Sequence, residues 1–154
     1  MLAREIMNQD VVTVTTRTSL AEAARLMLRH GINSLPVVDE QGRVVGMVGI
    51  RDVLRVPVPS QSETPILRWA RLEEKARALD QTRVDQVMAR RVVSVGEQAT
   101  AMEVAALMAN KGVHPIPVLR EGRLLGVVGR ADVVRALLAL STREGELGRD
   151  PASV

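Results

Sequence analysis

The sequence has no cysteine, no phenylalanine and no tyrosine, and it has a single tryptophan. Without cysteine the chain can form neither disulfide bonds nor thiolate metal sites, and its two histidines are too few for an all-histidine zinc site. Because aromatic side chains are nearly missing, Val, Leu, Ile, Met and Ala must fill the core. This composition suits a reducing compartment, so we expect a cytoplasmic protein that requires no metal.

Long apolar runs are also missing. No stretch approaches the roughly 18 consecutive apolar residues that a membrane span needs. The start, MLAREIMNQD, lacks the charged region and the apolar run of a secretory signal. We therefore expect neither secretion nor membrane insertion.

The charge is nearly balanced, with 21 basic and 18 acidic residues and a net charge of +3. Nucleic-acid binding usually needs a clustered basic stripe and aromatic side chains that stack on bases. The sequence shows neither, so we expect no nucleic-acid partner. With 46% hydrophobic and 25% charged residues, the composition indicates a soluble globular protein, long enough for one core or for two small halves.

What the sequence does contain is an internal repeat. Residues 6–38 align with 87–119 without gaps, and 42–55 align with 122–135, with 11 of 33 and 8 of 14 positions identical. Such self-similarity indicates that one supersecondary unit occurs twice. Because each copy alone is too small for a secure core, we expect the two copies to pack together with pseudo-two-fold symmetry.

The first half of each copy predicts a strand and a helix. The β-branched runs VVTV (11–14) and VVSV (92–95) predict the strand. The helix has one apolar face, starts at a Ser/Thr-x-x-Glu capping box and ends at a glycine suited to a left-handed C-cap. These cap residues are Ser19, Glu22 and Gly31 in the first copy and Thr100, Glu103 and Gly112 in the second.

The second half of each copy predicts a hairpin and a closing helix. Two apolar runs are joined by a short turn at Gly42 or Gly122, and the closing helix begins near Asp52 or Asp132. Two prolines end this helix early in the first copy, whereas in the second copy it can run to about Leu140. Each copy is therefore β-α-β-β-α, and the fold class is α/β.

The stretch between the copies predicts a connecting helix. Thr64 and Pro65 form a good N-cap and N1 pair. One side of the helix carries Ile66, Trp69, Leu72, Ala76 and Leu79, which indicates a helix docked on the body of the protein or, alternatively, at a dimer interface. The predicted domains are a first copy over 1–58, a linker with this helix over 59–82, a second copy over 83–140 and a flexible polar tail over 141–154.

The two copies contain GINSLPVVDEQGRVVGMVGIRDVL and GVHPIPVLREGRLLGVVGRADVV, and with them the chain resembles a tandem pair of CBS domains, the module named after cystathionine β-synthase. The resemblance covers about residues 2–57 and 83–139. It implies a regulatory module whose repeats pack through their sheets and leave two related clefts. It further implies that the clefts bind an adenosine-containing ligand, namely AMP, ADP, ATP or S-adenosylmethionine, and that the module forms a homodimer.

An aspartate at the start of each closing helix is the main candidate for ligand contact. Asp52 and Asp132 can cap backbone N–H groups, and a carboxylate there can also accept both hydroxyls of a ribose. The adjacent helix N-terminus suits phosphate, and Arg51 and Arg130 lie in the same turn. Since Arg130 corresponds to Ile50 and not to Arg51, the two clefts cannot present the same charge.

The chain departs from the family pattern at one place. The family usually has Ser or Thr where this chain has Gly49 and Gly129, so a hydroxyl that would contact ribose or phosphate is missing. The glycines either let a ligand approach the backbone closely or ease the strand-to-helix turn.

The loop before the second strand is the other region that the resemblance assigns to the ligand, with the base held between aliphatic groups. His114 stands where some family members have a phosphate-contacting histidine, and its counterpart is Asn33. Pro115 replaces Ser34 and removes a donor, so we expect the clefts to differ in affinity. The remaining candidate contacts are Leu35, Pro36, Ile116 and Pro117 in these loops and Val12, Thr13, Val93 and Ser94 at the first strands.

The sequence therefore predicts a stand-alone regulatory protein that senses an adenosine-containing ligand and signals to a separate effector protein or to another copy of itself. The alternative is a dimerisation or scaffold module that works without nucleotides, which the two glycines favour. We expect no enzyme, because the sequence shows no nucleophile–base pair, paired carboxylates, metal cluster or P-loop.

Overall fold

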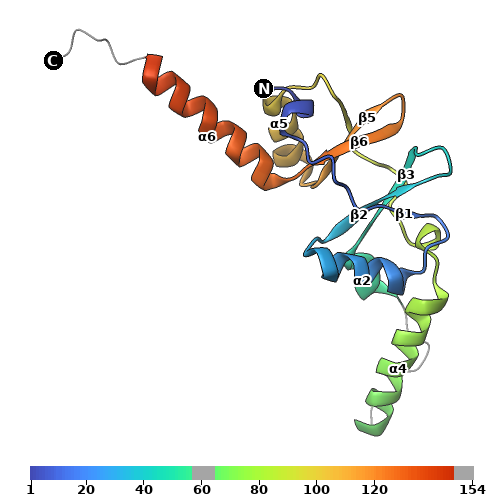
Figure 1. Cartoon of the computed structure of the whole chain (residues 1–154). Coiled ribbons are helices and arrows are strands. Elements are labelled where there is room, and N and C mark those ends of the chain that lie inside the picture. Colours follow the sequence, from blue (N-terminus) through green and yellow to red (C-terminus); the bar gives the residue numbers. More distant parts are fainter. Residues whose placement is uncertain (57–64, 148–154) are drawn as a thin grey trace. The chain divides into compact units, whose positions relative to one another are not determined.

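The computed structural model describes residues 1–56 and 65–147, and the chain divides into two compact units (Figure 1). The first-repeat unit comprises Val12–Val92, and the second-repeat unit comprises Met1–Val11 together with Val93–Val154. Each unit contains a three-stranded sheet and helices. The mixed α/β fold with two β-α-β-β-α units is therefore confirmed.

The first-repeat unit is built on the sheet β1-β2-β3. β1 (Val14–Thr15) runs parallel to β2 (Ser34–Val38), which is antiparallel to β3 (Val44–Gly49). α2 (Leu20–His30) connects β1 to β2, and α3 (Ile50–Arg55) follows β3 directly. The core between sheet and helices is aliphatic, and its largest fully buried side chains are Leu20, Met27, Leu35, Val37, Val48 and Val84.

The second-repeat unit has the same plan with the sheet β4-β5-β6. β4 (Val95–Gly96) runs parallel to β5 (Ile116–Arg120), which is antiparallel to β6 (Arg123–Val128). α5 (Ala101–Lys111) precedes β5, and α6 (Arg130–Leu147) follows β6. Its fully buried core side chains include Val104, Ile116, Val118 and Val128.

Each unit also contains a short segment that precedes the other repeat in the sequence. Residues 1–11, with α1 (Ala3–Ile6), lie on the second-repeat unit, where Asn8 pairs antiparallel with Val127. Residues 83–92, with the 3₁₀ helix η1 (Val84–Gln86), lie on the first-repeat unit, where Ala89 pairs with Met47. We call 1–11 and 83–92 the exchanged segments. The predicted domain boundaries follow the sequence repeat and stay a prediction.

The caps of the two helices α2 and α5 are only partly as predicted. Gly31 and Gly112 adopt the left-handed conformation, with φ of 62° at both, as predicted. The capping box is complete at Thr100, but Ser19 only accepts the backbone N–H of Glu22. The carboxylate of Glu22 lies 3.4 Å from Arg25 instead of reaching back to the N-cap.

Three predicted element boundaries were wrong. The first strands were predicted over 11–14 and 92–95, but β1 and β4 begin only at Val14 and Val95, because pairing with the next strand starts at these residues. The closing helix of the second copy continues to Leu147, beyond the predicted end at about Leu140.

The connecting helix α4 (Pro65–Gln81) begins at the predicted proline, while Thr64 lies outside the described residues. Ala78 and Leu79 near its end pack against the core of the first-repeat unit. Ile66, Trp69 and Leu72 near its start are 83%, 71% and 58% exposed. The expectation that the whole apolar stripe docks on the body is therefore wrong for the first half of α4.

Candidate ligand-binding site

The predicted contact residues lie at one edge of the sheet in each unit. Because β2 and β3 are antiparallel, the start of β2 lies beside the end of β3. Ser34 is paired there with Gly49. In the second-repeat unit Ile116 at the start of β5 is paired with Val128 at the end of β6. The structure thus brings the loop, the glycine and the aspartate of each repeat together.

Asp52 is fixed by the backbone of its own turn. Its Oδ2 accepts the backbone N–H of Gly49 at 2.7 Å, which ties the first turn of α3 to the end of β3. Among the described residues no hydrogen bond reaches Oδ1. The side chain of the neighbouring Arg51 is exposed. Asp52 therefore caps the helix with one oxygen and keeps the other for a donor from outside the turn.

Asp132 makes the same backbone contact and one more. Its Oδ2 accepts the N–H of Gly129 at 2.8 Å, and its Oδ1 accepts Nη2 of Arg135 at 2.6 Å. The Asp132 side chain is 22% exposed and the Arg135 side chain 71%. A ligand hydroxyl at Asp132 must therefore compete with an exposed ion pair, an interaction that is usually weak.

The loop of the first repeat holds an unpaired hydroxyl. Ser34 Oγ is buried and has no hydrogen-bond partner within residues 1–56 and 65–147. Its Cβ would lie 3.7 Å from a Cβ added at Gly49, and that added atom would lie 3.9 Å from Asp52 Oδ2, so the three residues are neighbours. A buried hydroxyl without a partner costs free energy, which a ligand atom at this place can recover.

The second repeat has a different loop. Pro115 stands in the place of Ser34 and offers neither a hydroxyl nor a backbone donor. His114 is exposed, as is its counterpart Asn33, whose carbonyl oxygen accepts the N–H of Ile50 at 2.9 Å. Arg130 is also exposed. The polar groups at the two edges therefore differ in kind as well as in position.

Some predicted contacts are core residues. The side chains of Leu35, Pro36, Ile116 and Pro117 are buried, so these residues can offer a ligand only their backbone atoms. Ahead of the first strands, Val12, Thr13 and Val93 are half-buried and Ser94 is exposed.

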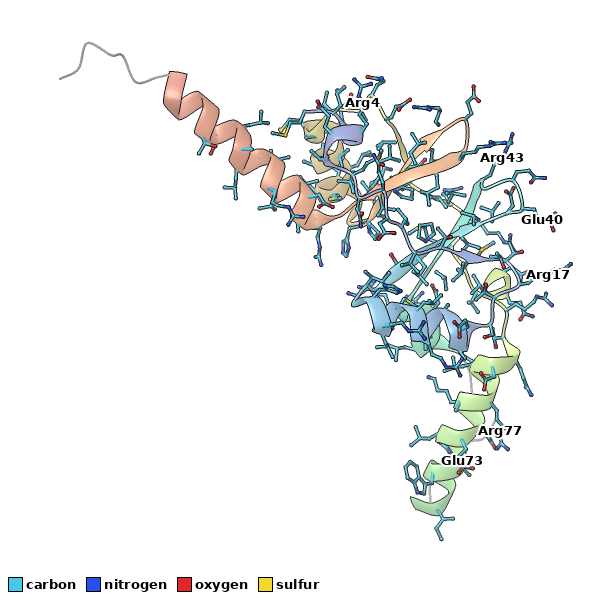
Figure 2. The ribbon with its side chains drawn as sticks, viewed as in Figure 1. Arg4, Arg17, Glu40, Arg43, Glu73 and Arg77 are labelled. Carbon is cyan, nitrogen blue, oxygen red and sulfur yellow. The ribbon has the colours of Figure 1, made fainter. Side chains whose placement is uncertain are left out.

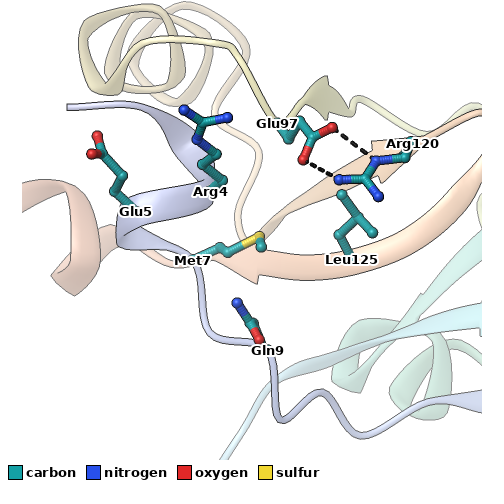
Figure 3. A pocket seen from close by; sticks show the side chains of 7 residues that line it. All are labelled: Arg4, Glu5, Met7, Gln9, Glu97, Arg120 and Leu125. Carbon is teal, nitrogen blue, oxygen red and sulfur yellow. Dashed lines mark hydrogen bonds and ion pairs between the residues drawn. The ribbon is translucent and has the colours of Figure 1, made fainter.

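A separate hollow of about 460 Å³ lies in the second-repeat unit and was not predicted (Figure 3). Its lining residues come from the exchanged segment, the loop after β4 and the hairpin: Arg4, Glu5, Met7, Gln9, Glu97, Arg120 and Leu125. Arg120 donates to both oxygens of Glu97, at 2.8 and 2.6 Å. The repeat alignment could have indicated this pair, because the oppositely charged Glu97 and Arg120 stand where the first repeat has Thr16 and Asp39.

The ion pair in this hollow shifts both titrations. The hydrogen bond from Arg120 holds the pKa of the Glu97 carboxyl below its usual value, and the charges of Arg120 and Arg4 lower it further, against a partial rise from desolvation. The same hydrogen bond raises the pKa of Arg120. A second hollow of about 630 Å³ lies between the loop after β4 and α5, where Gly96, Glu103 and Leu107 are among its lining residues.

Neither hollow is built like a metal site. Among residues 1–56 and 65–147, no three His, Asp or Glu side chains lie together in a way that could hold an ion. In the same part of the chain no helix has both the length and the hydrophobicity to cross a membrane.

Comparison with known proteins identifies the repeat. The family model described as "CBS domain" matches residues 3–58 and again 84–139, which are the two repeats found in the sequence. A CBS domain-containing protein of Dictyostelium discoideum is 30% identical over 139 residues, which cover 90% of this chain and 92% of that protein.

Solved structures agree in fold. The CBS domain pair of protein MJ0100, in complex with 5'-methylthioadenosine and S-adenosyl-L-methionine, is 26% identical with a TM-score of 0.68, over 91% of this chain and 98% of that one. CBSX2 in complex with AMP has a TM-score of 0.72 over 90% of this chain and 97% of that one, and its 24% identity supports the fold alone.

The relatives differ in length. The chain spans 92% of the Dictyostelium discoideum protein but only 23% of an L-aspartate semialdehyde sulfurtransferase of Methanocaldococcus jannaschii, to which it is 27% identical. The chain therefore matches a module that occurs inside larger proteins as well as in short ones.

Proposed function

The chain belongs to the CBS domain family, and on this premise we propose that it is a regulatory module, not an enzyme, that binds an adenosine-containing ligand. The ligand class is AMP, ADP, ATP or S-adenosylmethionine. The bound state would be passed on to a separate effector protein or to a second copy of the chain. The complex of the MJ0100 domain pair with two adenosine derivatives supports the ligand class.

The observation that supports this function best is the geometry of Asp52. One carboxylate oxygen is fixed by the Gly49 N–H, while the other accepts no hydrogen bond within the described residues. A carboxylate held in this way can accept a ribose hydroxyl without first giving up its role as a cap. The buried hydroxyl of Ser34 beside it is a further group that a ligand can satisfy.

The proposed ligand contacts follow from the chemistry at the two edges. Asp52 and Asp132 would accept ribose hydroxyls, and Arg51 and Arg130 would face phosphate. Since the chain has one aromatic residue, the base would lie between aliphatic groups. The other members of the proposed site are Val12, Thr13, Asn33, Ser34, Leu35, Pro36, Gly49, Val93, Ser94, His114, Pro115, Ile116, Pro117 and Gly129.

Calorimetric titration of the full chain with each of the four ligands tests this function. We expect heat from at least one ligand, and a loss of affinity of about tenfold or more when Asp52→Asn removes the ribose acceptor. Ser34→Ala should weaken binding by a smaller factor. Asp80→Asn is the matched control, because Asp80 is an exposed carboxylate paired with Arg25 at 3.5 Å.

A thermal-shift series gives the second readout. Because a ligand that binds only the folded state stabilises it by RT ln(1 + [L]/Kd), the unfolding midpoint should rise with ligand concentration. No heat and no shift with any of the four ligands at millimolar concentration would refute the ligand-binding function.

A dimerisation or scaffold module that works without nucleotides is the second candidate. The observation that favours it is the glycine at both 49 and 129, where the family usually has a hydroxyl. It predicts a dimer in light scattering and an unfolding midpoint that is indifferent to all four ligands.

A further inference from the structure

The first half of α4 presents an apolar stripe with no counterpart in the repeat. Ile66, Trp69 and Leu72 are 83%, 71% and 58% exposed, and they include the only aromatic side chain of the protein. Isolated exposed apolar residues are common, but three large ones along one helix form a patch that usually marks an interaction surface. We call these three residues the α4 stripe.

The opposite face of α4 shows why the stripe points outward. Arg71, Glu74 and Ala78 are half-buried, and Lys75 donates from Nζ to the carbonyl oxygen of Leu54 at 2.8 Å. This face and the contacts with α2 fix the rotation of the helix about its axis. Since residues three and four apart share a face, the α4 stripe must lie on the other side.

We propose that the α4 stripe is the contact by which two copies of this chain associate, with their α4 helices crossing antiparallel on a two-fold axis at Trp69. The stripe is symmetric about its centre, because Ile66 and Leu72 stand three residues before and after Trp69. In an antiparallel pair Ile66 of each copy therefore meets Leu72 of the other, and the two Trp69 rings meet each other. Such self-complementarity is what a two-fold interface requires.

The charge pattern agrees with this arrangement. Glu73 and Arg77 are exposed on α4, one and two turns beyond Trp69 (Figure 2). In the antiparallel pair Glu73 of one copy lies beside the helix N-terminus at Pro65 of the other. A carboxylate is favourable at a helix N-terminus, whereas a parallel pair would place Glu73 against Glu73.

The size of the contact sets the strength that we expect. The six side chains are 58% to 83% exposed, so at roughly 150 to 250 Å² for each fully exposed side chain the contact would remove on the order of 800 Å² from water. This area is below the size of a standard specific interface and indicates a weak dimer that dissociates on dilution. The inference does not depend on the proposed ligand.

Sedimentation equilibrium of the full chain, with and without Trp69→Glu, is the first test. We expect a concentration-dependent dimer in the parent protein and a monomer for the variant. Leu28→Glu is the matched control, because Leu28 on α2 is 76% exposed but lies outside the α4 stripe. Circular dichroism checks that each variant is folded.

Cysteine cross-linking then tests the register, since the chain has no cysteine of its own. Under mild oxidation a mixture of Ile66→Cys and Leu72→Cys proteins should yield a covalent dimer, whereas each protein alone should yield little, because disulfides need Cα atoms within about 7 Å. Trp69→Cys alone should cross-link, and Leu28→Cys should not.

Three outcomes would overturn the inference. One is a parent protein that stays monomeric at all concentrations with the emission of an exposed tryptophan. Another is a dimer that Trp69→Glu leaves intact, which would assign association to a different surface. The third is efficient cross-linking of Ile66→Cys alone, which would indicate parallel helices.

Discussion

The two repeats have the same Asp-x-x-Arg sequence at the start of their closing helix but use it differently. In the second repeat Arg135 donates to Asp132 at 2.6 Å, whereas among the described residues Arg55 forms no ion pair with Asp52. Arg55 is the last residue of α3, while Arg135 lies inside a helix that continues to Leu147. The same motif therefore leaves Oδ1 of Asp132 hydrogen-bonded in the second repeat, whereas Oδ1 of Asp52 accepts no hydrogen bond among the described residues of the first.

The two repeats also differ in the polar groups of their loops and hairpins. Ser34 has a buried hydroxyl, unpaired in the part of the chain that the structure describes, where the second repeat has Pro115. Asp39 Oδ1 accepts two backbone N–H groups of its own turn at 2.9 Å each, whereas its counterpart Arg120 pairs with Glu97. Both repeats fill their cores with apolar residues, while the polar groups that a ligand or a partner would contact differ between them.

The largest expected effect comes from truncating the side chains at the equivalent core positions Leu35 and Ile116, both 0% exposed. Leu35→Ala and Ile116→Ala should each lower the free energy of unfolding by about 2 to 5 kcal/mol, through lost burial and a cavity. Denaturant unfolding measures this. Destabilisation of only one variant, or unfolding of the two variants in different transitions, would show that the two cores are not equivalent.

The next effect concerns the glycines against which the exchanged segments pack. A methyl group at Gly126 would lie 2.7 Å from the carbonyl oxygen of Asn8, and at Gly46 it would lie 2.5 Å from Sδ of Met88. Gly126→Ala should cost about 1 to 3 kcal/mol and Gly46→Ala less, because the nearest atom at Gly46 belongs to a movable methionine side chain and the backbone oxygen of Ala89 lies farther away, at 3.0 Å.

Gly96→Ala is the control for this pair, since nothing lies within 4 Å of its added Cβ. Thermal unfolding of the three variants measures the order of their stabilities. Equal stability of Gly126→Ala and Gly96→Ala would show that residues 1–11 are not packed against β6 in solution.

A smaller effect is expected at the helix caps. Ser19→Ala and Thr100→Ala should each cost about 1 kcal/mol, because both hydroxyls accept a backbone N–H. The repeats should differ at the glutamates instead. Glu103→Ala removes a hydrogen bond to the Thr100 N–H at 2.6 Å and should lower the unfolding midpoint, while Glu22→Ala should change it little. Equal midpoints for the two glutamate variants would contradict the structural difference.

The smallest effect is a pH dependence that only the second repeat should show at its hairpin. Since the folded pKa of Glu97 is lowered from 4.5 by Arg120, its contribution to stability is present above the unfolded pKa and is lost as the pH falls through the folded value. Glu97→Gln should therefore be less stable than the parent protein at pH 7, and this difference should shrink as the pH falls below 4.5. Glu40→Gln on the other hairpin is the control, and a Glu97→Gln midpoint equal to the parent at pH 7 would refute the pair.

Much of the fold could be predicted because its determinants are local. The period of apolar residues, the turn glycines and the C-caps at Gly31 and Gly112 act within a few residues, and the structure confirms them. From the same local patterns, the candidate site could be predicted only as a set of residues near Asp52 and Asp132. Whether each carboxylate oxygen is free depends on where Arg55 and Arg135 lie, which no repeat alignment contains.

The sequence by itself determined that one β-α-β-β-α unit occurs twice, with an aliphatic core and an aspartate at each closing helix, because composition and short spacings suffice for these. Only the tertiary structure decided that residues 1–11 and 83–92 pack on the unit of the other repeat, and that Trp69 faces outward while Leu79 packs inward. The physical reason is that these outcomes depend on contacts between residues far apart in the chain, which short-range sequence patterns do not specify.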